Sequence, residues 1–204
     1  MAATERHDVI VVGAGNAALC AALAASEGGA RVLVLERAPE AERGGNSRFT
    51  SASMRFAYRE IADLRAVMRD LGDAELEKID FGIYTTEDFY NDMFRVTNYR
   101  TDPALCETLV TRSFETVRWL AQMGIRFLPR LTHAFESNGR YKFSGGVVTE
   151  AAGGGEGLNE RQTQLALARG VVVRYGARVV SLMFDGHTVA VSYTHLTLPT
   201  KRIV

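Results

Sequence analysis

A glycine-containing turn near the start of the chain constrains the fold more than any other feature. The run DVIVVGAG, residues 8–15, is apolar and rich in valine up to its glycines, which predicts a buried parallel strand. An alanine-rich helix follows and stops at Gly28 and Gly29, and ARVLVLE, residues 30–36, predicts a second strand. A strand, a helix and a second strand within about 30 residues form a βαβ unit with a right-handed crossover.

The turn itself fits the pattern G-x-G-x-x-[G/A] across residues 13–18. Gly13 permits the tight turn, Gly15 lets backbone N–H groups approach a pyrophosphate, and Ala18 is small enough for the helix to pack on the strand. Glu36 lies 23 positions after Gly13, where a carboxylate accepts hydrogen bonds from a ribose and disfavours a 2′-phosphate. The sequence therefore predicts a site for NAD or FAD rather than NADP, with a plain glycine turn as the alternative.

A second glycine-containing loop follows the second strand. Gly44 and Gly45 precede Asn46 and Ser47, which are placed to cap a helix. A second helix start fronted by glycines suits a larger dinucleotide whose flavin lies beyond the pyrophosphate, and so favours FAD over NAD. An ordinary glycine loop with an Asn or Ser cap is the alternative.

The middle of the chain predicts helices and then short extended segments. Helices are expected over residues 54–73, from Thr86 as a possible cap, and from Asp102 as N-cap through Pro103 to a stop at Gly124. Together with the start of the chain, this order indicates an α/β fold with an α+β middle section. The remaining expected elements are a strand at 125–129, a hairpin arm at 140–150, a helix after the glycine-rich loop ending at Gly170, strands at 171–175 and 177–185, and a turn at Asp185-Gly186.

Composition excludes several classes of partner. Lys and Arg together number 24, as do Asp and Glu, and apolar residues make up 47% of the chain, which argues against nucleic acid or an anionic membrane surface as partner. Cys20 and Cys106 lie far apart without a Cys/His cluster, so neither a disulfide framework nor a metal site is expected. Residues 1–7 contain no apolar signal segment, and glycines interrupt the apolar stretch at 9–25, so we expect a cytoplasmic protein without a membrane span.

These runs, together with RGGNSRFT at residues 43–50, resemble FAD-dependent oxidoreductases of the fumarate reductase/succinate dehydrogenase flavoprotein type. The resemblance covers residues 8–188 and implies a Rossmann-like FAD-binding fold of the glutathione-reductase type, here incomplete. Within that family, NSRFT, MRFAY, DFYNDMFRVT and ETVRWLAQMGIRF look most like the tricarballylate dehydrogenases.

The resemblance also implies a cofactor role for particular residues. Asn46 falls where membrane-bound succinate dehydrogenases carry a flavin-linking His, so the FAD is expected to be non-covalent. GGGEGL, residues 153–158, matches the glycine-rich segment that opens a later helix near the active-site side. The implied FAD contacts are Gly13, Ala14, Gly15, Ala17 and Ala18 at the pyrophosphate, Glu36 and Arg37 at the adenosine ribose, Gly45, Asn46 and Ser47 on the phosphate and flavin side, and the backbone of Val179 at the adenine.

The chain departs from the family pattern at two places. TSAS, residues 50–53, replaces a TGGA-like run, so Ser51 and Ala52 carry Cβ atoms that would crowd the flavin or require an unfavourable φ. The family's substrate-binding His and Arg residues and its proton-transferring Arg lie further along than this chain extends, so no catalytic residue is assigned. Arg130, His133, Arg140 and Tyr141 form a polar group in the middle of the chain that we interpret as a surface loop.

The end of the chain breaks the pattern of strands. VSYTHLTLPTKRIV, residues 191–204, resembles a translated sequencing adapter, so we expect a non-native tail that begins between Ala190 and Ser192; a frayed terminal strand is the alternative. Residues 1–190 are then the N-terminal part of the FAD-binding domain of a longer protein, whose substrate-clamping domain is absent here.

For that longer protein, the resemblance implies oxidation of a polycarboxylate such as tricarballylate to cis-aconitate, with hydride transfer to flavin N5. Its electron acceptor is unidentified, and a membrane-associated protein is one candidate. A fumarate reductase-like enzyme or another flavoprotein desaturase is the first alternative, a truncated and inactive nucleotide-binding fragment is the second, and a nicotinamide-dependent dehydrogenase is the third.

Overall fold

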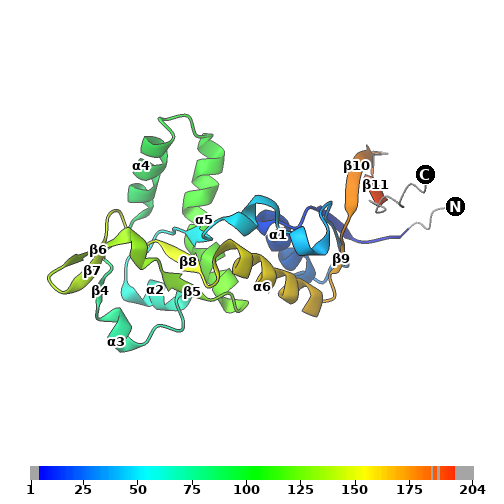
Figure 1. The fold of residues 1–204 in the computed structure, drawn as a ribbon. Coiled ribbons are helices and arrows are strands. Elements are labelled where there is room, and N and C mark those ends of the chain that lie inside the picture. The colour runs from blue at the N-terminus through cyan, green and yellow to red at the C-terminus, as the bar shows by residue number, and fades with distance from the viewer. Residues whose placement is uncertain (1–4, 185, 188, 196–204) are drawn as a thin grey trace, which may run out of the picture. The chain divides into compact units, whose positions relative to one another are not determined.

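The computed structural model describes residues 5–184, 186–187 and 189–195, and it divides into two compact units (Figure 1). Residues up to Thr50 and from Gly155 onward form the first unit, and Ser51–Gly154 form the second. No helix of the described residues is long and apolar enough to cross a membrane. The predicted tail falls partly outside this range, since residues 196–204 are not described.

The first unit is built around a parallel three-stranded sheet in the order β1-β2-β9. Strand β1 (Val9–Val12) pairs with β2 (Val32–Leu35), and β2 pairs with β9 (Val172–Arg174). Helix α1 (Asn16–Glu27) connects the first two strands and helix α6 (Gly154–Ala168) precedes the third. All four residues of β2 are buried, as expected of a central parallel strand. The predicted βαβ unit is confirmed.

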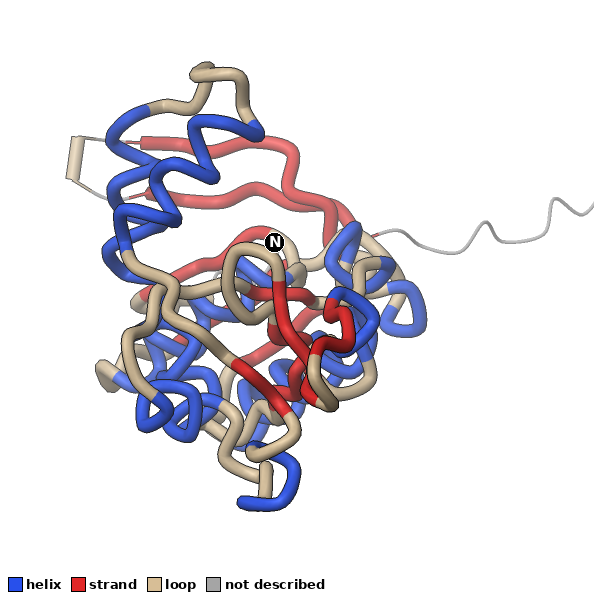
Figure 2. The backbone as a smooth tube through the Cα atoms, turned by 90° about the vertical axis from the view of Figure 1, so that its left-hand side faces the viewer, coloured by secondary structure: helices blue, strands red, loops and turns tan. Residues whose placement is uncertain are grey.

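Two short helices and a long hairpin complete the first unit. Two short 3₁₀ helices, η1 (Glu40–Glu42) and η2 (Gly45–Phe49), follow β2. Strand β10 (Ala177–Phe184) pairs antiparallel with β11 (Val189–His195), and Figure 2 shows the two strands in red, running side by side. The predicted turn between them includes Asp185, which lies outside the described residues.

The second unit combines two small sheets with four helices. One sheet has the order β3-β8-β5 with antiparallel pairs, and the other has the order β4-β7-β6. The predicted hairpin arm over residues 140–150 is confirmed only for residues 140–143, which pair with β6, because residues 149–151 belong to the other sheet. The elements are β3 (Ser53–Met54), α2 (Ile61–Val67), α3 (Asp73–Leu76), β4 (Ile79–Asp80), α4 (Thr86–Val96), α5 (Pro103–Gln122), β5 (Phe127–Pro129), η3 (Leu131–His133), β6 (Ala134–Ser137), β7 (Arg140–Phe143) and β8 (Thr149–Ala151).

The prediction of one helix over residues 54–73 is wrong. The segment before α2 is extended, because the backbone of Tyr58 exchanges hydrogen bonds of 2.7 and 3.1 Å with that of Tyr84. Helix α2 begins only after Glu60, whose N–H donates to the carboxylate of Asp63 at 3.2 Å. Apolar residues at helical spacing therefore did not suffice, since tertiary pairing outweighs propensity in a short segment.

Helix α5 has the predicted boundaries, whereas α4 begins one residue away from its expected cap. Asp102 accepts a 2.9 Å hydrogen bond from the N–H of Leu105, and Gly124 beyond the helix end has a φ of +98°. The cap of α4 is Thr85 rather than Thr86, because the hydroxyl of Thr85 accepts from the N–H of Asp88 at 3.1 Å. The two helices lie antiparallel in Figure 1.

Candidate dinucleotide-binding site

The first glycine loop leaves the carboxyl end of β1 in a conformation that requires glycine. Gly13 has a φ of +96°, and its N–H donates to the carbonyl of Leu35 at 2.8 Å. A Cβ built on Gly13 would meet nothing within 4 Å, so the backbone angle rather than space excludes other residues. This conformation turns the chain sharply from the strand into helix α1.

The peptide groups around Ala14 are held from two sides. Its N–H donates to Oε2 of Glu36 at 2.7 Å, and its carbonyl accepts from Nδ2 of Asn159 at 2.7 Å. The other oxygen of Glu36, Oε1, accepts from the N–H of Ala38 at 2.8 Å, and Glu36 is only 7% exposed. Glu36 thus orders the glycine loop itself, and its contact with a ribose stays a prediction.

The first turn of α1 presents backbone donors beyond the loop. The N–H of Asn16 donates to the hydroxyl of Ser47 at 3.0 Å, and the first bond within the helix runs from Leu19 to the carbonyl of Gly15 at 2.9 Å. Among the described residues, no partner is recorded for the N–H groups of Ala17 and Ala18. No acidic side chain lies in this turn, so the positive end of the helix dipole is not neutralised. These groups fit an anionic pyrophosphate.

The second glycine loop packs beside the first, but it does not start a capped helix. Gly44 and Gly45 have φ values of +100° and +53°, and Gly44 precedes the five-residue 3₁₀ helix η2 as its N-cap. The prediction that Asn46 and Ser47 cap a helix is therefore wrong. Ser47 lies inside η2, and its hydroxyl instead accepts from the first residue of α1, Asn16. Asn46 and Gly45 are exposed.

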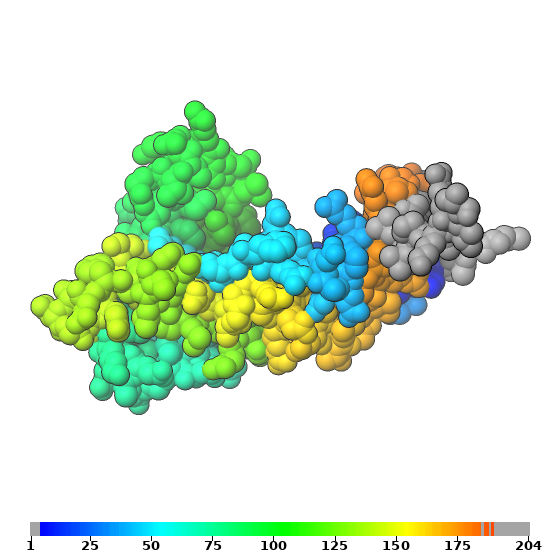
Figure 3. Space-filling model, in the orientation of Figure 1, coloured from blue at the N-terminus to red at the C-terminus, as the bar shows by residue number. Residues whose placement is uncertain are grey.

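Helix α6 contributes contacts that the sequence does not predict. The N–H of Gly155 donates to the carbonyl of Thr50 at 2.8 Å, and Figure 3 shows the yellow start of α6 against the blue-to-cyan segment that ends at Thr50. Asn159 and Gln162 are buried, at 4% and 0% exposure, and face the glycine loops. The sequence alone carries no signal for them, because α6 also contains exposed polar residues such as Glu156 and Glu160.

The remaining predicted cofactor residues of the first unit lie along the carboxyl edge of the sheet or next to it. Arg37 is exposed directly after Glu36. The N–H of Ala177, at the start of β10, donates to the carbonyl of Glu36 at 2.8 Å, which brings that strand to the predicted ribose position. Val179, two residues on, packs partly buried against Leu33, Leu35 and Ala177. The structure thus gathers these residues at one edge, and their contacts with a cofactor stay predictions.

The departure at Ser51 and Ala52 lies at the start of the second unit. Ala52 is buried and has a φ of +48°, so the expectation of an unfavourable φ is confirmed at this position. The hydroxyls of Ser51 and Ser53 accept hydrogen bonds from Nη1 of Arg130 at 2.5 and 2.6 Å. Arg130 also lies 3.5 Å from the carboxylate of Glu150. Both serines therefore contribute to a local polar cluster.

The four polar residues singled out in the middle of the chain do not form one site. Arg130 contacts the serine cluster just described, whereas Nη2 of Arg140 donates to the carbonyl of Ile79 at 2.7 Å. His133 and Tyr141 are exposed, on η3 and β7. The surface interpretation fits these separate contacts.

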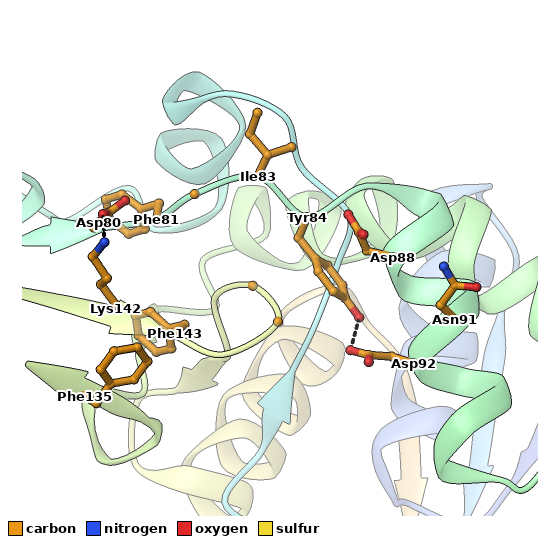
Figure 4. Close-up of a pocket in the computed structure, with 13 residues that line it drawn as sticks. Asp80, Phe81, Ile83, Tyr84, Asp88, Asn91, Asp92, Phe135, Lys142 and Phe143 are labelled. Atoms are coloured by element: carbon orange, nitrogen blue, oxygen red, sulfur yellow. Dashed lines mark hydrogen bonds and ion pairs between the residues drawn. The ribbon is translucent and has the colours of Figure 1, made fainter. Parts of the chain in front are cut away.

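The second unit also contains a hollow of about 430 Å³ between α4 and the β4-β7-β6 sheet (Figure 4). Its charged groups already pair with neighbours: Lys142 lies 2.9 Å from Asp80, and the hydroxyl of Tyr84 donates to Asp92 at 2.9 Å. Burial is the main cause that raises the pKa of Tyr84, to about 12. These groups therefore stabilise the unit, and no group of three or more metal-ligating side chains occurs in the part of the chain that the structure describes.

Comparison with known families agrees with this geometry. The profile of a family described as the FAD binding domain matches residues 8–195. The chain belongs to this family. Its cofactor is therefore FAD, and the peptide groups at the start of α1, whose N–H donors have no recorded partner in the described part of the chain, fit the pyrophosphate of that cofactor.

The chain is also similar to flavoprotein oxidoreductases of known name. NADH:fumarate oxidoreductase from Klebsiella pneumoniae (strain 342) is 30% identical over 124 residues, which cover 61% of this chain and 12% of that protein. Fumarate reductase (cytochrome) from Shewanella frigidimarina is 29% identical over 117 residues, which cover 57% of this chain and 18% of the relative. A probable fumarate reductase from the same species is 26% identical over 200 residues, 94% of this chain and 29% of the relative.

Solved structures share the fold. A flavocytochrome c3 fumarate reductase in its open conformation superposes with a TM-score of 0.63 at 26% identity, covering 92% of this chain and 30% of the other. A 3-ketosteroid dehydrogenase from Rhodococcus jostii RHA1 superposes with a TM-score of 0.68, covering 96% of this chain and 44% of the other. Because its identity is only 20%, this likeness shows the fold alone. The Rossmann-like FAD-binding fold is confirmed, and the chain spans between 12% and 44% of the length of these proteins.

Proposed function

We propose that this chain is the FAD-binding part of a flavoprotein dehydrogenase that oxidises a polycarboxylate, with tricarballylate converted to cis-aconitate. The observation that carries the FAD-binding part is the first turn of α1, where the N–H groups of Ala17 and Ala18 have no recorded partner among the described residues and the positive φ of Gly13 turns the chain into the helix. When bound, FAD accepts the hydride that leaves one substrate carbon while the neighbouring carbon loses a proton.

The residues of the first unit would bind and orient this cofactor. The N–H groups of Ala17 and Ala18 would donate to the pyrophosphate, aided by the positive end of the α1 dipole. Glu36 holds the N–H of Ala14, so the loop keeps its shape before the cofactor arrives. Such preorganisation favours binding because less conformational freedom is lost on association.

The attachment of FAD would be non-covalent. The resemblance places Asn46 where a flavin-linking His stands in membrane-bound relatives, and a side-chain amide is not a nucleophile of that kind. Asn46 is exposed in η2, within the loop that packs beside the phosphate loop.

The substrate-binding groups would belong to further parts of a longer protein. Supporting this, the chain spans 12% to 29% of the length of the curated relatives reported above. A polycarboxylate requires cationic groups, whereas Arg130 and Arg140 of the second unit already contact oxygen atoms of their own unit. The electron acceptor would be a separate, unidentified partner.

A second candidate is the reverse class of reaction, reduction of an activated carbon–carbon double bond. It is favoured by the names of the relatives, which include reductases of fumarate and a vinyl phenol reductase 29% identical over 127 residues. The same FAD-binding residues would serve both directions, since the direction depends on the substrate and on the electron partner.

Anaerobic titration of the protein expressed from its complete reading frame distinguishes the two candidates. The proposal predicts that tricarballylate bleaches the visible absorption band of bound FAD and that cis-aconitate accumulates in equal amount. Reoxidation of dithionite-reduced protein by fumarate, without bleaching by tricarballylate, would support the second candidate. A response to neither substrate would refute both.

A further inference from the structure

We propose that the buried polar face of α6 sets the shape of both glycine loops, and that Asn159 is a positioning residue for the cofactor's phosphates. The inference rests on the proposed FAD binding and concerns how the site is held. The face consists of Gly155, Asn159 and Gln162, which lie on one side of the helix because residues three and four apart are neighbours.

Asn159 fixes one peptide group of the first glycine loop. Its Nδ2 donates to the carbonyl of Ala14 at 2.7 Å, and the side chain is only 4% exposed. In a trans peptide the C=O and the following N–H point in opposite directions. Because Asn159 holds the carbonyl of Ala14 toward α6, it directs the N–H of Gly15 away from that helix.

The N–H of Gly15 is available for a ligand. Among the described residues no partner is recorded for it, in contrast to the N–H groups of Gly13, Ala14 and Asn16, which donate to Leu35, Glu36 and Ser47. Asn159 therefore holds the Ala14–Gly15 peptide in the orientation in which the N–H of Gly15, like those of Ala17 and Ala18, can donate to a phosphate. Glycine on both sides of Ala14 leaves this peptide free to rotate when the side-chain contact is lost.

Asn159 contacts the second loop as well as the first. A Cβ built on Gly44 would lie 2.8 Å from both Cγ and Oδ1 of Asn159, so the buried amide lies directly against the backbone of Gly44. One side chain thus contacts both glycine loops, which also lie directly against each other, since a Cβ built on Gly15 would lie 3.4 Å from the carbonyl oxygen of Gly44.

The other two members of the face contact the elements that follow the two loops, α1 and η2. Nε2 of Gln162, which is fully buried, donates to Oδ1 of Asn16 at 2.8 Å. The N–H of Gly155 donates to the carbonyl of Thr50 at the end of η2. Helix α6 therefore touches the start of α1, the first loop and the second loop at successive turns, which is the arrangement needed to preform the site.

The test compares Asn159→Ala with the matched control Thr163→Val, at another buried polar residue of the same helix. Thr163 is 4% exposed, and its hydroxyl donates to the carbonyl of Asn159 at 2.8 Å, so the control loses a buried hydrogen bond without touching a loop. Apoprotein would be titrated with FAD by flavin fluorescence and with ADP as competitor, and unfolding by urea would be measured without FAD. Circular dichroism would confirm that each variant is folded.

We expect Asn159→Ala to raise the dissociation constants of FAD and of ADP by a similar factor of about ten or more, because ADP shares the pyrophosphate, and Thr163→Val to change them less than twofold. Equal weakening by both variants, or binding by Asn159→Ala within twofold of the parent, would overturn the inference. If Asn159→Ala does not fold, the isosteric Asn159→Asp replaces it, because its carboxylate cannot donate to the carbonyl of Ala14. The same rise in the dissociation constants of FAD and ADP is then expected, and the same outcomes would overturn the inference. Failure of the parent protein to bind FAD would instead refute the proposed function.

Discussion

Replacement of Gly155 by alanine tests the tight packing between α6 and the second glycine loop. A Cβ at this position would lie 2.8 Å from both oxygen atoms of Thr50 and closer still to the carbonyl oxygen of Ser47. Two of these three atoms belong to the backbone and cannot move alone, and separating the segments would break the 2.8 Å hydrogen bond from Gly155 to Thr50.

The magnitude follows from three contributions. Overpacking costs about 1–3 kcal/mol, the lost hydrogen bond costs about 1 kcal/mol, and the better helix propensity of alanine returns about 1 kcal/mol. We therefore expect Gly155→Ala to lower the free energy of unfolding by about 2 kcal/mol, which is more than a tenfold change in the folded-to-unfolded ratio.

Urea unfolding followed by circular dichroism measures this difference. Gly28→Ala is the matched control, because Gly28 is exposed, has a φ of −75° and would place its Cβ no closer than 3.4 Å to another atom. Alanine at Gly28 should leave the free energy of unfolding unchanged or raise it by about 0.5 kcal/mol. A loss at Gly155 no larger than that at Gly28 would refute the packing argument.

Three other substitutions test separate parts of the structure. Ala52→Gly should change the free energy of unfolding by less than about 1 kcal/mol, because relief of the strain in the left-handed backbone offsets the lost methyl group. The control Ala22→Gly, in the buried interior of α1, should cost about 2 kcal/mol in the same urea assay. Equal losses from the two substitutions would contradict the argument about strain at Ala52. Glu36→Gln should lower the free energy of unfolding by about 2 kcal/mol in thermal and urea unfolding, since one amide oxygen cannot accept from the N–H groups of both Ala14 and Ala38. An unchanged unfolding midpoint would contradict the role of Glu36 in ordering the glycine loop. Hydrogen bonds from Arg31 lower the pKa of Asp8 from 3.8 to about 2, so the contribution of Asp8 to the free energy of unfolding is present above pH 4 and lost as the pH falls toward 2. Asp8→Asn should therefore be less stable than the parent at pH 5, and the difference should shrink toward pH 2. A difference that does not change with pH would contradict the role given to the Asp8 carboxylate.

Features with local causes could be predicted from the sequence. The positive φ at Gly13, the strand–helix–strand order and the boundaries of α5 each depend on residues within a few positions of one another. The left-handed strain at Ala52 was predictable for a related reason, since the family pattern expects glycine there.

Features with distant partners could not be predicted in this way. The sequence predicts that Ser47 caps its own helix, whereas its hydroxyl accepts a hydrogen bond from the N–H of Asn16, 31 residues earlier. Asn159 bonds to Ala14, 145 residues away, and on a helix a buried polar residue looks like a solvent-facing one until its partner is known. The break in the predicted helix before α2 likewise comes from pairing between Tyr58 and Tyr84.

The central claim is that this chain forms the non-covalent FAD site of a flavoprotein, and acid precipitation of the purified full-length protein tests it most directly. We expect a yellow protein whose flavin passes entirely into the supernatant as FAD, in a ratio close to one per chain. A yellow pellet would show covalent attachment and contradict the role given to Asn46. A colourless protein that binds NAD in titration, and does not take up FAD, would contradict the account as a whole.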